Sequence, residues 1–190
     1  FDPIDAALSG GASASSGIEI AALGVALQNL AVQAGSALRG ASDVEQGLDG
    51  SLTFADATDA VFRSLAEQIS VLPPETDLPA SQAQFEDLLS DAAVKAGLGA
   101  DAQDHLAPSA GDIANVMLSG LDALDEVSAD PIEALRELAQ TASVLQHDAS
   151  SDIEAAVEAA AGEASDPSAL SALLASFTGE ALEAAIEVSP

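Results

Sequence analysis

A run of oxygen-bearing side chains between residues 45 and 56 has the length and spacing of a calcium-binding loop. The segment reads EQGLDGSLTFAD, and Gly50 at its centre would permit the sharp turn that such a loop needs. Ca²⁺ prefers carboxylate, hydroxyl and carbonyl oxygens, with side chains and backbone both contributing. The candidate ligands are Glu45, Asp49, Ser51, Thr53 and Asp56. Calcium is therefore the one candidate cofactor that the sequence suggests.

The second half of this segment resembles a known kind of loop. Residues 49–54 (DGSLTF), with a helix expected to follow, are similar to the second half of an EF-hand or dockerin-type calcium loop. The segment departs from that pattern where Glu45 and Gly47 take the first and third positions and the short Asp56 takes the twelfth. These departures imply weak binding, of about millimolar affinity. The alternative is a turn that enters a helix capped by Thr53 and Asp56.

No other group of residues forms a catalytic pattern. The two histidines, His105 and His147, are not spaced as zinc ligands on a helix, and cysteine is absent. The acidic residues are so numerous that a pair of carboxylates carries no information about acid–base chemistry. We expect a protein without enzymatic activity.

Charge is the most unusual property of the composition. Lys and Arg number 4 and Asp and Glu number 32, which gives a formal net charge of −28. Four scattered cations cannot neutralise a phosphate backbone, so nucleic acid is not expected as a partner. A domain with this charge repels itself at low ionic strength, so mobile cations should surround the native state. This predicts adaptation to high salt.

Helical periodicity and helix-start signals run through the whole chain. Ser or Thr followed by an acid three residues later, and Asp before Pro, both mark N-termini. Gly40, Gly97 and the cluster at residues 148–151 are read as stops. The helices are expected near residues 3–9, 18–39, 54–71, 81–96, 110–128, 131–147, 152–164 and 167–187, the last with a kink at 178–179. The fold class is all-α, a bundle of about seven to eight helices. Its core should be Ala-rich, since 43 residues are Ala and 5 are Phe.

Residues 20–38 contain no charge and approach the length of a membrane span. Gln28, Asn29 and Gln33 lie within this stretch, where hydrocarbon would penalise them. We therefore expect the most buried helix of a soluble bundle, and no membrane span. One domain is expected over residues 1–190, and the Pro-rich linker 71–79 would join sub-lobes 1–70 and 80–190 if the chain divides.

These features favour an exported structural or assembly protein, such as a subunit of a filament, surface layer or adhesin, located outside the cell or at its surface. Its main partner would be other copies of itself, in a homo-oligomer or polymer. The start at Phe1 suggests removal of an N-terminal segment, either a signal peptide or another portion of a longer chain. The alternatives are an intracellular scaffold or binding module in the cytoplasm of a high-salt organism and, third, a calcium-dependent helical module.

Overall fold

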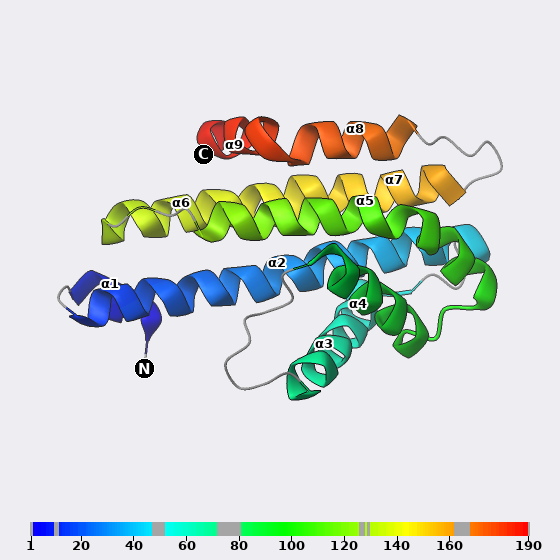
Figure 1. The fold of residues 1–190 in the computed structure, drawn as a ribbon, viewed down its shortest axis with the longest axis horizontal. Coiled ribbons are helices and arrows are strands. Elements are labelled where there is room, and N and C mark those ends of the chain that lie inside the picture. Colours follow the sequence, from blue (N-terminus) through cyan, green and yellow to red (C-terminus); the bar gives the residue numbers. More distant parts are fainter. Residues whose placement is uncertain are drawn as a thin grey trace.

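The computed structural model describes residues 2–9, 12–46, 52–71, 81–125, 128, 130–161 and 168–189, and it contains no strand within those ranges. The protein is an all-α helical bundle, as the sequence predicts (Figure 1). In chain order the helices are α1 (Pro3–Ser9), α2 (Ala12–Gln46), α3 (Phe54–Val71), α4 (Gln82–Lys95), α5 (Ala100–Asp125), α6 (Pro131–Ser143), the π-helical segment η2 (Val144–Ala149), α7 (Ser150–Ala161), α8 (Ser168–Phe177) and α9 (Gly179–Val188).

The long helix α2 organises the bundle. It packs against α5, α6 and α7 along one side, while α3 and α4 lie across its later half and α8 covers α5 and α7 as an outer layer (Figure 1). The shared core combines many buried Leu, Ile, Met and Phe side chains, among them Phe85 and Leu30, with many buried alanines. This agrees with the predicted Ala-rich core.

Local signals set several helix ends correctly. The Asp2 carboxylate accepts from the backbone N–H of Ile4 at 2.9 Å, and the Asp130 carboxylate accepts from Ile132 at 3.0 Å. At the end of α4, Leu98 N–H donates to the carbonyl of Ala93 and Gly97 N–H to that of Val94, with Gly97 at a φ of 76°. This is the Schellman arrangement that favours glycine.

Other predicted boundaries are wrong. The helix expected at 110–128 begins ten residues earlier, at Ala100, and runs through Pro108. Proline in a helix interior costs about 3 kcal/mol, but Ala102, Leu106 and Ala110 are buried along this turn and hold it in place. Ser109 and Asp112, a Ser followed by an acid three residues later, therefore lie inside a helix rather than at its start.

The predicted stop at residues 148–151 is also wrong. α6, η2 and α7 follow one another without a break, because Leu145, Ala149 and Ile153 are all fully buried and continue one apolar face. The last helix is broken as expected: α8 and α9 meet at an angle of 62°.

Helix α2 passes through Gly40 and is longer than the expected 18–39. From Asn29 to Ser42 most of its residues are buried, as expected for a core helix, but over its first half one face is open. Between Ala14 and Asp43 the helix is long and apolar enough to cross a membrane, and 28% of its most apolar 18-residue window is buried.

Core residues come from both sides of the Pro-rich segment: Val61 and Leu65 of α3 belong to the same buried cluster as Phe85 and Leu88 of α4. Residues 72–80 themselves lie outside the described ranges. The domain limits, and a division into lobes 1–70 and 80–190, stay predictions.

Candidate functional site

Only part of the predicted calcium loop can be placed. Asp49 and Ser51 lie outside the described residues, and Glu45 belongs to the last turn of α2. At the other end, the Thr53 hydroxyl donates to the Asp56 carboxylate at 2.6 Å and accepts from the Asp56 backbone N–H at 3.2 Å. Thr53 and Asp56 thus act together as the N-terminal cap of α3. Within the described part of the chain, no three His, Asp or Glu side chains are grouped so that they could hold a metal.

Each of the four cations makes an ion pair. Arg63 pairs with Asp59 within α3, and Arg136 pairs with Glu133 within α6. Lys95 joins two helices, since its ammonium group contacts Asp91 on α4 and lies 3.1 Å from Glu67 on α3. Hydrogen bonding from Lys95 lowers the pKa of Asp91, and the same bond raises the pKa of Lys95.

Arg39 is the cation that connects α2 to α7. Its guanidinium lies 3.1 Å from the Glu154 carboxylate, and both side chains are about 30% exposed or less. Burial raises the pKa of Glu154 despite Arg39, and the carboxylates of Asp43 and Glu158 add to this rise. Arg39 Nε and Asp43 Oδ1 are buried without a hydrogen-bond partner, so this contact is polar and incompletely satisfied.

Two amides on α2 face the π-helical segment. The Gln146 side chain donates to Asn29 Oδ1 at 2.7 Å, and Gln33 Nε2 lies 3.5 Å from the Leu145 carbonyl oxygen. Asn29 is 3% exposed and Gln33 is 1% exposed. A π-helical turn breaks the regular pattern of backbone hydrogen bonds, and here it brings Gln146 and the Leu145 carbonyl to the two amides. Polar residues in an apolar helix were the one signal visible in the sequence, and it does not identify their partners.

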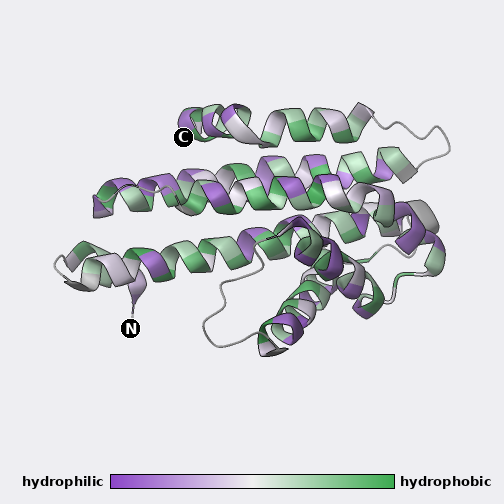
Figure 2. Cartoon of the chain, in the orientation of Figure 1, coloured by the Kyte–Doolittle hydropathy of each residue, from purple (hydrophilic) through white to green (hydrophobic). Residues whose placement is uncertain are grey.

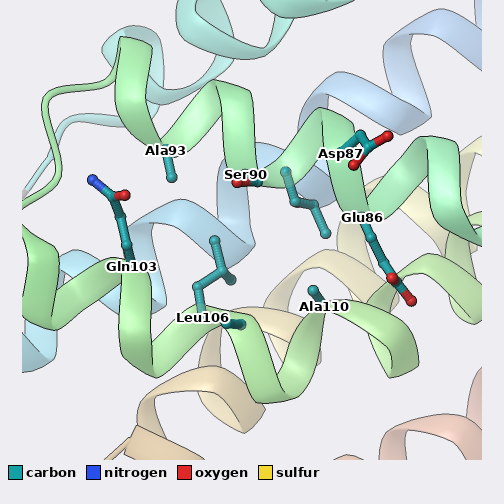
Figure 3. A pocket seen from close by; sticks show the side chains of 9 residues that line it. Glu86, Asp87, Ser90, Ala93, Gln103, Leu106 and Ala110 are labelled. Atoms are coloured by element: carbon teal, nitrogen blue, oxygen red, sulfur yellow. The ribbon is translucent and has the colours of Figure 1, made fainter.

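A cleft of about 260 Å³ lies between α4 and α5 (Figure 3). Its base is apolar: Leu106 and Ala110 of α5 lie across from Ala93 of α4 (Figure 3), and Leu89 of α4 also lines it. Its rim is polar, formed by Glu86, Asp87, Ser90 and Gln103. Gln103 donates to the Leu98 carbonyl oxygen at 2.7 Å, and Gln82 donates to Glu86 at 2.7 Å.

The chemistry of this cleft follows from its lining. With two carboxylates and no cation at the rim, it would accept an apolar group that carries a positive charge. Sequence reasoning missed it, because Glu86 and Asp87 look like any other exposed acids of this chain until α5 is placed beside them.

A second feature is an exposed apolar face on the first half of α2. Ile20 is 45% exposed and Leu23 46% exposed, and Leu27 is partly buried one turn further on. Gly24 lies among them with open space around its Cα. Figure 2 shows this half of α2 as largely apolar. We call the row Glu19, Ile20, Leu23, Gly24, Leu27 and Gln28 the α2 stripe; all of these are exposed except the partly buried Leu27.

Comparison with known proteins gives no relative: no protein-family model, no curated protein and no solved structure matches this chain.

Proposed function

We propose that this protein is a structural or assembly protein without enzymatic activity, exported and adapted to salt-rich surroundings, that forms a homo-oligomer or polymer. It would serve as a subunit of a filament, a surface layer or an adhesin. The observation that carries the proposal is the α2 stripe, where large apolar side chains stay in contact with water in the isolated chain. Exposed apolar surface of this kind commonly marks an interaction site.

The charge supports the salt adaptation. Acidic side chains repeat one turn apart on exposed helix faces, as at Glu180, Glu183 and Glu187 of α9. Like charges at this spacing destabilise a helix, and dissolved cations reduce the repulsion. The proposed location is outside the cell or at its surface, with the cytoplasm of a high-salt organism as the alternative.

The cleft between α4 and α5 favours a second candidate function, an intracellular scaffold or binding module of such an organism. The bound group would be an apolar cation, such as a lysine side chain of a partner placed over Leu106. Ser90→Trp, at an exposed position of its lining, would fill the cleft. It should abolish binding of such a partner while leaving self-association unchanged, and the reverse result would exclude this candidate.

Thermal unfolding at different salt concentrations tests the proposed adaptation. Between about 0.01 M and about 1 M salt the Debye length falls from about 30 Å to about 3 Å, so repulsion among the acidic side chains is largely removed. The midpoint of unfolding should rise steeply over this range. An unchanged midpoint would contradict the proposal. Potassium chloride and sodium chloride should act alike, because the effect requires only mobile cations.

A further inference from the structure

We propose that the α2 stripe pairs with the same stripe of a second copy, in an antiparallel arrangement related by a twofold axis that passes between Leu23 and Gly24. This inference rests on the proposed function, because it names the surface through which copies assemble. The low charge of the stripe suits a second copy as the partner, the order of its residues sets the antiparallel orientation, and Gly24 permits a close approach.

Charge restricts where two such chains can meet. Each copy carries −28, but residues 12–38 contain a single charged side chain, Glu19. The other exposed large apolar residues on long helices have charged neighbours, as Phe62 of α3 has Asp59 and Arg63. Helix α8 also lacks charge, but its exposed positions include Ala172 and Ala175, which bury little area. The α2 stripe therefore combines large exposed apolar side chains with little repulsion between copies.

The order of residues in the stripe is self-complementary when the two helices run antiparallel. With the axis between residues 23 and 24, Ile20 lies opposite Leu27 of the second copy and Leu23 lies opposite its Gly24. Glu19 and Gln28, which are about 180° apart around the helix, stay at the two edges of this interface. A parallel pair would place Glu19 against Glu19. Each contact occurs twice, as a twofold interface requires.

Gly24 permits the two helices to approach closely at the axis. A methyl group added at Gly24 would meet no atom within 4 Å, so the space beside it is open for the Leu23 side chain of the second copy. The opposite face of α2 is held in place, since Ala26 is buried with Leu124 of α5 and Leu138 of α6. The stripe is thus presented on a fixed helix.

Cysteine cross-linking tests this register directly, because the natural chain contains no cysteine. Ile20→Cys and Leu27→Cys are prepared separately and then mixed at high salt under mild oxidation. In the antiparallel pair residue 20 of one copy faces residue 27 of the other. The two copies of residue 20 are about 10 Å apart along the helix axis, which is too far for a disulfide. The mixture should form at least about tenfold more cross-linked dimer than either variant alone, or than the control Val94→Cys, on the exposed face of α4.

Four results would overturn the inference. Cross-linking of each variant alone, with no more in the mixture, would show a parallel pair. Oligomers in light scattering without cross-linking would show that copies meet elsewhere, and the proposed function would stand. Binding of the wild type, but not Leu23→Glu, to phosphatidylcholine vesicles, with no cross-linking, would assign the stripe to lipid. A strictly monomeric mass would contradict both the inference and the proposed function.

Discussion

Gly40 of α2 lies directly against the backbone of Glu154 on α7. A Cβ atom at residue 40 would be 2.5 Å from the Glu154 carbonyl oxygen and 3.1 Å from Val157 Cβ. The two helices can pack this closely only because residue 40 has no side chain. The same contact places the Arg39 guanidinium beside the Glu154 carboxylate. Gly40, which looks like a helix stop in the sequence, is thus a packing contact at the centre of the bundle.

Gly40→Ala should therefore destabilise the protein by about 1–3 kcal/mol, because the backbone of α7 must shift to admit the methyl group. Gly24→Ala is the matched control on the same helix, since its methyl group would be unobstructed. It should stabilise by about 0.5–1 kcal/mol through helix propensity. Denaturant unfolding at low protein concentration measures both. Equal effects of the two substitutions would contradict the close contact.

Burial raises the pKa of Glu154 above its ordinary value of 4.5, so the folded state binds a proton more readily than the unfolded chain. The ionised Glu154 carboxylate therefore destabilises the folded state. This destabilisation is absent below about pH 4.5 and develops as pH rises through the raised pKa of the folded state. Glu154→Gln should be relatively more stable than the wild type at pH 7 than at pH 4. Asp152→Asn controls for the loss of one negative charge at an exposed position of the same helix. A difference between wild type and Glu154→Gln that does not vary with pH would refute the assignment.

The bond between Gln146 and Asn29 holds the π-helical segment against α2. Gln146→Ala would leave the side-chain oxygen of Asn29 buried without its donor, which should lower the free energy of unfolding by about 1–3 kcal/mol. The double variant Asn29→Ala with Gln146→Ala should cost less than the sum of the two single variants, because the coupling is lost only once. Unfolding free energies of the four proteins give the coupling. Strict additivity would mean that the two amides do not interact.

Calcium titration at high sodium, with wild type and Asp49→Ala, tests the predicted loop. We expect the two isotherms to coincide, because the Asp56 carboxylate already accepts from the Thr53 hydroxyl as part of the helix cap. Calcium would then bind only diffusely to the acidic surface. A saturable component that Asp49→Ala removes would instead establish a site at Glu45–Asp56.

The sequence predicted elements whose ends are set by neighbouring residues. The bounds of α1 and α3 match the expected 3–9 and 54–71, because Asp2 and Thr53 cap them locally. The errors arose where distant packing overrides a local signal. Pro108 stays inside α5 because buried side chains on both sides of it hold the turn. No residue near Gly40 in the sequence indicates that Glu154 packs against it.

The α2 stripe was missed for a related reason. Hydropathy marked residues 20–38 as apolar, but it could not tell which of them meet other helices of the same chain. The structure divides that run: Leu30 and Leu38 are buried, whereas Ile20 and Leu23 are open to solvent. Which residues of α2 stay exposed, and so could serve the proposed assembly, depends on how the other helices pack, and a single sequence does not contain that information.

Light scattering at high salt measures whether copies of this chain associate through the α2 stripe. The chain has a mass of 18.8 kDa, and the wild type should give twice that value or more at about 2 M salt, where charge repulsion is screened. Leu23→Asp, which places a charge beside the proposed axis, should return the mass to that of a monomer, whereas Val94→Asp on α4 should not. A monomeric mass for the wild type from about 0.1 M to about 2 M salt would contradict the account.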